Sequence, residues 1–246
     1  KWSDLKKTGM TSGTDKAGGG HAHTGMMIYL GDNWPAEYRG NVFTLNLHGL
    51  RMNQESLHRQ GAGYVGKHAA DFMFTSDKWF RGIELSYAPD GSVYVLDWSD
   101  IGECHDNDGI HRTSGRIYRI SYGKTEAAKV DLTKWSNEDL AESGDSPNEW
   151  YSRQARQLIQ QRAAAGQDLT KVALKLMNTY RLTSSTPNAL RAMWTLNAIG
   201  SADEDWLLEQ SNDEREHIRT WAIKLLCDQK ALSKKTQKRF IEMGGQ

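Results

Sequence analysis

The spacing of apolar residues changes near residue 123, and this change constrains the fold more than any other feature. Upstream, short runs of alternating or clustered apolar residues have the length of β-strands and are separated by Gly, Asn and Pro-Asp-Gly. From about residue 148 onward, apolar residues recur at the period of an α-helix instead. The sequence therefore predicts a two-domain β + α protein, with strand-like runs at 25–31, 40–47, 63–74, 82–98 and 115–123.

The first domain is predicted to span 1–123, and a polar linker with about one helical turn is predicted at 124–147. Pro89 and Asp90 suit the early positions of a β-turn, and Gly91 can adopt a positive φ, so this stretch predicts a hairpin. Several short strands at regular spacing are typical of a sandwich, a barrel or a propeller. Alternation alone leaves these three architectures open.

The second domain is predicted at 148–246 and contains three stretches with a shared rhythm, in which an arginine precedes a small or apolar run. The arginines are Arg153, Arg191 and Arg219, and Gly200 is placed to end the second helix. Such irregular self-similarity is typical of helical hairpins stacked into a solenoid. The predicted apolar stripes are Trp150, Ala155, Leu158 and Ile159; Leu190, Met193, Trp194 and Leu196; and Ile218, Trp221, Ala222, Leu225 and Leu226.

Charge and composition argue against several classes of partner. The 31 basic and 31 acidic residues cancel, so no net field draws the chain onto nucleic acid or anionic lipid. No apolar run approaches the length that spans a bilayer. The first residues lack both an initiator methionine and the apolar core of a signal peptide, so we expect a mature or truncated product. Cys104 and Cys227 form no disulfide framework and no haem-attachment motif, which leaves the compartment open.

Three stretches carry a family resemblance: "YLGDNWPAEYRGNVFTLNLHG", "WFRGIELSYAPDGSVYVLDWSD" and "SGRIYRISYG". They resemble the closing blades of the six-bladed β-propeller of glucose/sorbosone-dehydrogenase-like proteins. "GHAHTGMMIYLGDNWP" and "GECHDNDGIHRTSGRIYRI" are similar to one branch, the large membrane-bound dehydrogenase family of planctomycete- and verrucomicrobia-type bacteria. In that branch HEAT-like helical repeats, and often a cytochrome c module, follow the propeller.

The resemblance implies terminal propeller blades followed by an α-helical HEAT-like segment. About 100 residues supply only some two blades, and open sheet edges need covering. We therefore expect a fragment whose first partner is the remainder of its own propeller, in the periplasm or cell envelope. The implied function is oxidation of a sugar or polyol, with electrons passed to a quinone or cytochrome acceptor. The alternative is a non-catalytic module that binds a glycan or a protein.

The resemblance also implies a cofactor, pyrroloquinoline quinone with calcium, at the mouth of the propeller channel. The alignment places His48 where relatives carry a lysine, and Arg81 at one position of an arginine pair whose other position is Trp79. Arg81, His48 and Arg112 form the predicted cofactor-binding set, because a guanidinium fork suits a carboxylate. The alternative for Arg81 is a bridge between neighbouring strands or loops.

The segment after residue 100 concentrates groups that ionise or bind metal. In a propeller it would join two strands of the closing blade and cross the channel mouth, where histidines can bind metal or move protons. We predict His105 and His111 with Arg81 as catalytic residues, and Asp106 and Asp108 as metal ligands. The alternative is a set of Asx-turns that fastens a long loop.

His21 and His23 form a second candidate metal site. Alternate residues on an extended strand share one face, so both imidazoles would point the same way. Imidazole suits several transition metals, although a stable site needs further ligands. Histidines that face solvent or pair across strands are the alternative.

Overall fold

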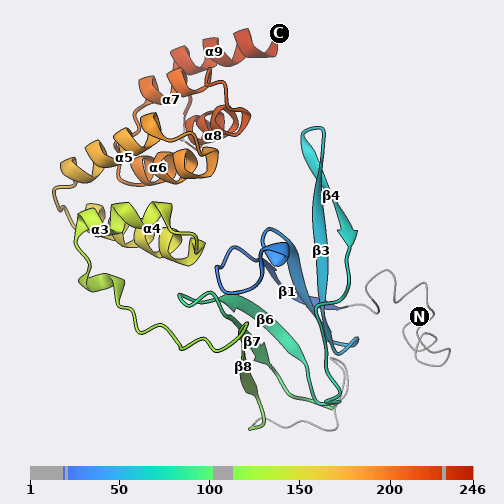
Figure 1. The fold of residues 1–246 in the computed structure, drawn as a ribbon. Helices are drawn as coiled ribbons and strands as arrows, with labels where there is room; N and C mark the ends of the chain where they lie inside the picture. Colours follow the sequence, from blue (N-terminus) through green and yellow to red (C-terminus); the bar gives the residue numbers. More distant parts are fainter. Residues whose placement is uncertain (1–18, 20–21, 102–112, 229–230, 246) are drawn as a thin grey trace. The chain divides into compact units, whose positions relative to one another are not determined.

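The computed structural model describes residues 19, 22–101, 113–228 and 231–245, and it has the predicted β + α composition. The chain divides into two compact units, Lys1–Lys129 and Val130–Gln246, here called the strand unit and the helical unit (Figure 1). The boundary falls inside the segment predicted as a linker. Leu132 and Leu140 are buried in the core of the helical unit, so the second half of that segment is part of a folded body.

The strand unit contains two antiparallel sheets. In the first sheet the strand order is β1–β2–β3–β4, with β5 also paired to β3; in the second it is β6–β7–β8. The first sheet is built from β1 (His23–Ile28), β2 (Val42–Asn46), β3 (Arg51–Gln60), β4 (Gly63–His68) and β5 (Met73–Phe74), and a short 3-10 helix η1 (Ala36–Tyr38) precedes β2. The second sheet is built from β6 (Gly82–Tyr87), β7 (Val93–Asp97) and β8 (Arg116–Ile120).

The two sheets pack face to face through β1 and β2 on one side and β6 on the other. The backbones approach closely at two glycines: a Cβ on Gly25 would lie 2.8 Å from Leu85, and one on Gly82 would lie 3.0 Å from Leu45. Thr24 Oγ1 donates a hydrogen bond of 2.7 Å to the Gly82 carbonyl across this interface. Small residues therefore allow the inner faces to meet.

Strand β3 was not among the predicted strands. Its first half alternates between buried Met52 on one face and Arg51 and Asn53 on the other. Polar residues usually mark a solvated face, so the run has the composition of a loop. Pairing with β2 and β4 on either side makes it a central strand.

The predicted hairpin between β6 and β7 is confirmed. Tyr87 pairs with Val93, and the Gly91 amide donates to the Ala88 carbonyl at 2.9 Å. Gly91 has a φ of 72°, and a Cβ there would lie 2.5 Å from the Asn33 amide nitrogen. The position therefore requires glycine for both its conformation and its contacts.

Tyr29 joins this hairpin to the first sheet. Its side chain is fully buried, and its hydroxyl donates to the Gly91 carbonyl at 2.8 Å while accepting from the amides of Asn33 and Trp34 at 3.0 and 2.8 Å. Burial raises the pKa of Tyr29 above its ordinary value. Trp34 stacks on the ring, with 4.6 Å between centroids. One hydroxyl thus satisfies three main-chain groups.

Tyr29→Phe should destabilise the strand unit by about 1–3 kcal/mol, because three main-chain groups lose a partner while the ring remains. Hydrogen–deuterium exchange of strand-unit peptides under mild denaturant would measure the loss. Tyr64→Phe, at an exposed position of β4, is the matched control and should change stability by less than about 0.5 kcal/mol. Equal losses of stability in the two variants would contradict the role given to the Tyr29 hydroxyl.

The helical unit consists of helices that contact in consecutive pairs: α3 with α4, α5 with α6 and α7 with α8. The second helices of the pairs also contact one another, α4 with α6 and α6 with α8. The elements are η2 (Leu132–Lys134), α3 (Asn137–Glu142), η3 (Ser143–Asp145), α4 (Glu149–Ala164), α5 (Thr170–Leu182), α6 (Thr186–Ala198), α7 (Glu204–Gln210), α8 (Glu216–Cys227) and α9 (Lys234–Gly244). None of the helices in the described residues is long and apolar enough to cross a membrane.

The predicted apolar stripes form the core of this unit. Ile159, Met193, Leu196 and Ile218 are almost completely buried, and the tryptophans of the stripes pack partly buried against them. Helix α6 ends at the predicted place, where Gly200 has a φ of 74° and Ser201 donates to the Leu196 carbonyl at 2.8 Å. The helical period in the sequence therefore identified the buried faces.

A polar network links α5 to the turn before α8. The Tyr180 hydroxyl lies 2.6 Å from Gln210 Oε1 and 3.1 Å from Asp213 Oδ2, and Arg215 donates to both carboxylate oxygens of Asp213. The hydrogen bonds from Arg215 lower the pKa of Asp213 to about 2. Because this folded-state pKa lies below the ordinary value of 3.8, ionised Asp213 stabilises the fold above that value, and the contribution is lost as the pH falls through about 2.

Asp213→Asn should therefore be less stable than the parent protein near neutral pH. The difference in the free energy of unfolding should stay constant down to about pH 5 and shrink as the pH falls from about 4 towards 2. Urea unfolding followed by far-ultraviolet circular dichroism would measure it, because the described α-helices all lie in the helical unit. A difference that persists undiminished at the acid end would show that the charge of Asp213 contributes nothing.

Candidate functional site

Several predicted site residues fall outside the described part of the chain. The segment 102–112 contains His105, Asp106, Asp108, His111 and Arg112, and the second candidate metal site contains His21. Their predicted roles stay predictions. The structure does describe the two attachment points of this segment, at the end of β7 and the start of β8.

Asp97, the last residue of β7, organises these attachment points. Its side chain is completely buried, and Oδ1 accepts hydrogen bonds from the amides of Arg81 and Ser99 at 2.8 and 2.9 Å. Arg116, the first residue of β8, donates through Nε to Oδ2 at 2.8 Å. The buried charge is thus bound by two amides and a guanidinium, the arrangement that makes such burial tolerable.

Arg116 also reaches Asp77, where Nη1 lies 2.5 Å from Oδ2. Two contacts lower the pKa of Asp77: the larger cause is a hydrogen bond from the Trp79 amide, and the smaller is the hydrogen bond from Arg116. Asp77 is about one-third exposed, in contrast to Asp97. Arg116 therefore joins one buried and one partly solvated carboxylate.

Arg81 is buried, and its guanidinium donates to main-chain carbonyls. Nη1 lies 2.9 Å from the Lys78 carbonyl and 2.8 Å from the Phe80 carbonyl, and Nη2 lies 3.1 Å from the Ile101 carbonyl. These contacts fasten the turn before β6 to Ile101, the residue just before the segment 102–112. The alternative role, a bridge between neighbouring loops, accounts for these three hydrogen bonds.

The other described candidates lie in the first sheet or its turns. His48 occupies the turn between β2 and β3. His23 lies exposed on β1, and its Nδ1 is 3.1 Å from Thr44 Oγ1, a cross-strand contact. Within the described ranges, no three His, Cys, Asp or Glu side chains are grouped closely enough to hold a metal ion.

The prediction missed a polar cluster on β3, β4 and the following loop. Asp71 binds Arg51 Nη1 at 2.7 Å and Asn53 Nδ2 at 2.6 Å, and His68 Nδ1 lies 2.7 Å from Glu55 Oε1. Cross-strand pairing of Glu55 with His68 places the cluster on the face of β3 opposite buried Met52. The sequence signal that could have revealed the cluster was the alternation along 51–55, which places Arg51, Asn53 and Glu55 on one face of a strand.

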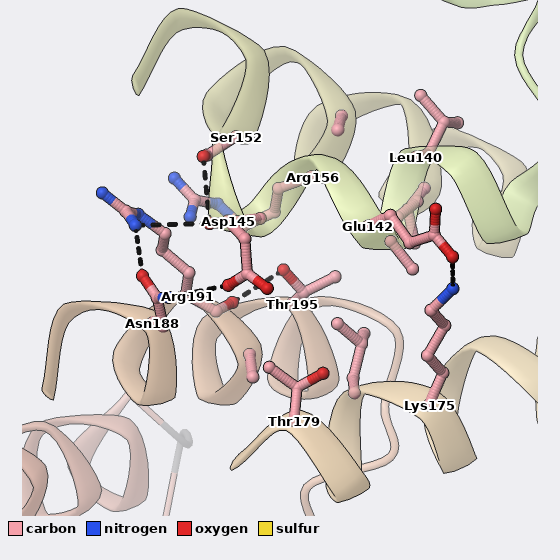
Figure 2. Close-up of a pocket in the computed structure, with 16 residues that line it drawn as sticks. Leu140, Glu142, Asp145, Ser152, Arg156, Lys175, Thr179, Asn188, Arg191 and Thr195 are labelled. Atoms are coloured by element: carbon pink, nitrogen blue, oxygen red, sulfur yellow. Dashed lines mark hydrogen bonds and ion pairs between the residues drawn. The ribbon is translucent and has the colours of Figure 1, made fainter. Parts of the chain in front are cut away.

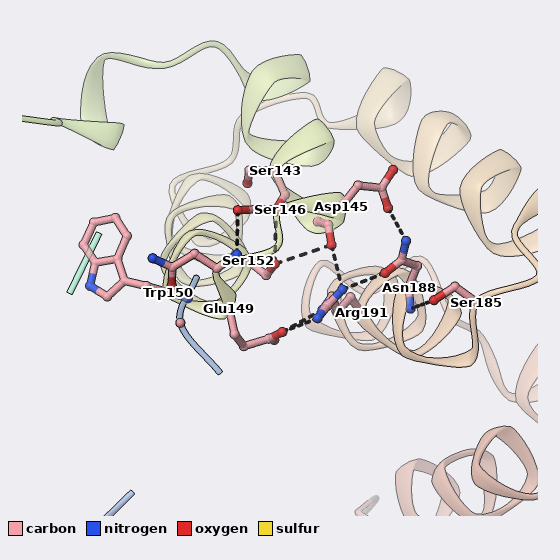
Figure 3. A network of polar contacts seen from close by, with 12 residues as sticks. Ser143, Asp145, Ser146, Glu149, Trp150, Ser152, Ser185, Asn188 and Arg191 are labelled. Carbon is pink, nitrogen blue, oxygen red and sulfur yellow. Dashed lines mark hydrogen bonds and ion pairs between the residues drawn. The ribbon is translucent and has the colours of Figure 1, made fainter. Parts of the chain in front are cut away.

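A second feature outside the prediction is a cavity of about 60 Å³ in the helical unit, enclosed by α3, η3, α4, α5 and α6 (Figure 2). Figure 3 shows the adjoining network: Arg191 donates through Nε to Glu149 Oε2 at 2.8 Å and through Nη1 to Asn188 Oδ1 at 2.6 Å. Arg191 also donates to the Gly144 carbonyl at 3.2 Å, so it ties α6 to η3 and α4.

Arg156, on α4, lines the same cavity and differs from Arg191. Its guanidinium lies 5.3 Å from the centroid of the Trp194 ring. Burial lowers the pKa of Arg156, with Arg153 and Arg191 acting in the same direction and Glu149 opposing them. The guanidinium nevertheless stays charged, because arginine does not lose its proton in proteins.

In a comparison with known protein families, one family model matches most of the strand unit. Residues 3–124 match the family described as "Domain of unknown function (DUF7133)". The match ends beside residue 123, where the apolar period changes, and leaves the helical unit unmatched. Neither the curated proteins nor the solved structures gave a match. The chain is thus similar to this family over nearly half its length.

Asp97→Asn should destabilise the strand unit by about 3 kcal/mol, because a buried charge that binds two amides and Arg116 is removed. Asp77→Asn is the matched control: it removes a partly solvated partner of the same arginine and should destabilise the unit clearly less than Asp97→Asn. Hydrogen–deuterium exchange of peptides from β6 to β8 would report both values. Equal costs would mean that burial of Asp97 is unimportant.

Proposed function

We propose that the strand unit forms terminal blades of a six-bladed β-propeller. Support comes from the sheet faces that point away from the buried interface. On the second sheet, cross-strand neighbours Leu96 and Ile117 are 41% and 68% exposed, and on β1 Met26 is 72% exposed. Apolar residues gathered on a sheet face mark an interaction surface. Neighbouring blades would cover both faces.

For the helical unit we propose HEAT-like repeats. Support comes from the pairing of consecutive helices and from the contacts between the second helices of successive pairs. Arg191 and Arg219 add a repeated detail, since Arg191 donates to one main-chain carbonyl in the turn before α4 and Arg219 to two in the turn before α8. Helical pairs that contact their sequence neighbours are the organisation of solenoids.

The complete protein, in this proposal, is a periplasmic or cell-envelope oxidoreductase that oxidises a sugar or polyol and passes electrons to a quinone or cytochrome acceptor. One observation carries the proposal: the histidine- and acid-rich segment 102–112 is attached through a buried frame built on Asp97 and Arg81. A frame of this kind can fix reactive side chains in place. His105 or His111 would then accept a proton from a substrate hydroxyl.

The proposed cofactor, pyrroloquinoline quinone with calcium, stays a proposal, because most of its proposed ligands lie outside the described residues. Arg81 directs two guanidinium nitrogens to main-chain carbonyls, and His23 contacts a threonine across the sheet. The remaining proposed ligands are His48 in its turn, Arg112, His21, Asp106 and Asp108. We therefore derive no reaction step through the quinone.

A second candidate function is a non-catalytic module that binds a glycan or a protein. The contacts of Arg81 favour it, because a guanidinium engaged by three carbonyls serves the loop that it fastens. The β3–β4 cluster also favours the binding module, because Arg51 and Asn53 both donate hydrogen bonds to the Asp71 carboxylate within the cluster.

The decisive experiment is a dye-linked oxidation assay on the complete propeller-bearing protein, with sugars and polyols, with and without pyrroloquinoline quinone and calcium. We expect turnover that His111→Ala lowers by about 10²–10⁴-fold, the usual contribution of a general base. His58→Ala, at an exposed position of β3, is the matched control and should leave turnover unchanged.

No turnover under any cofactor condition would overturn the dehydrogenase proposal. If the same preparation binds a glycan equally well with and without the His111 imidazole, the binding module is the better description. Turnover that responds equally to both histidine variants would remove His111 from the site.

A further inference from the structure

The cavity in the helical unit has the size and the chemical lining of a small-ligand site. Its volume is about 60 Å³, and a cavity needs roughly 10–15 Å³ on this measure to hold one water, so it has room for several waters or one small ion. Figure 2 shows polar side chains converging on it from several helices, among them Ser152, Arg156 and Thr195. Three of the lining residues are cationic: Arg156, Lys175 and Arg191.

Two of these three cations are matched by acids. Arg191 donates to Glu149, and Lys175 pairs with Glu142. Asp145 also lines the cavity, where its Oδ1 accepts a hydrogen bond of 2.7 Å from Asn188. These pairs account for the other two cations of the cavity wall, whereas the Asp145 carboxylate hydrogen-bonds to a neutral amide.

Arg156 is the exception. Its Nη1 is buried and has no hydrogen-bond partner among the described residues, and no described carboxylate forms an ion pair with it. Its contact with the Trp194 ring supplies no acceptor oxygen for that nitrogen. Buried guanidinium groups are ordinarily hydrogen-bonded and paired. The wall therefore presents one cation whose hydrogen-bonding capacity is unused.

We propose that this cavity binds one small oxyanion, of the phosphate or carboxylate type, through the guanidinium of Arg156. The planar guanidinium fork matches two oxygens of such a group, and the ligand supplies both the negative charge and the acceptor that Arg156 lacks. Ordered water would supply the acceptor alone. This inference is independent of the proposed function, because it involves only the helical unit.

The test is thermal unfolding of the full chain, followed by far-ultraviolet circular dichroism, in increasing sodium phosphate with sodium chloride holding the ionic strength constant. A ligand that binds only the folded state raises Tm in a saturable manner. We expect such a rise for the parent protein. Replacing phosphate with sodium acetate distinguishes a phosphate-type ligand from a carboxylate-type ligand. A rise in Tm with acetate alone would assign the cavity to a carboxylate.

Arg156→Gln should abolish the anion-specific rise, and Arg156→Lys, which keeps the charge without the fork, should weaken it. Arg153→Gln, at an exposed position one turn earlier on α4, is the matched control and should keep the full rise. If Arg156→Gln fails to fold, the Lys variant and calorimetric titration of the parent protein with phosphate and acetate decide the question. Equal responses to both anions and chloride, or an unaltered rise in the Arg156 variants, would overturn the proposal.

Discussion

Burial of one apolar face of each sheet against the other is the interaction on which the strand unit depends. Phe43 and Leu45 on the first sheet and Leu85 and Val95 on the second are almost completely buried. Each such side chain contributes about 1.5–3 kcal/mol when removed from water. Because side chains alternate along a strand, fixing the inner faces also fixes which residues lie on the outer ones. The charged cluster of β3 and the exposed apolar residues of β7 and β8 are consequences of that choice.

Arginines in both units bind main-chain carbonyls as well as carboxylates. Arg81 holds the turn before β6 against Ile101, and Arg191 and Arg219 hold turns in the helical unit through main-chain carbonyls. A guanidinium can satisfy several carbonyls at once because its five donors lie in a plane. The shared rhythm of arginines in the sequence therefore has a structural meaning, at least at Arg191 and Arg219. Arg156 differs because its surroundings offer an aromatic ring and a cavity instead of carbonyls.

The candidate site could be predicted from the sequence only as a set of ionisable residues. Position and residue type showed that Arg81 and the segment 102–112 lie near each other along the chain, but not where the guanidinium would point. Asp97 was not singled out at all, although it is the buried carboxylate that joins β6, β7 and β8. Its importance comes from burial and from partners 16 and 19 residues away, and neither is encoded in a local pattern. The β3–β4 cluster was missed for a different reason: its residues alternate along β3, but the run 51–60 was not predicted as a strand.

The sequence by itself determined the local features of this protein. The change of apolar period set the β + α composition, the Pro-Asp-Gly turn set the β6–β7 hairpin, and the helical stripes set the core residues, because each depends on neighbours a few positions apart. Only the tertiary structure decided that the polar run 51–60 is a central strand. It alone decided which charges are buried in pairs and which is left facing a cavity, since burial and pairing arise when distant segments meet.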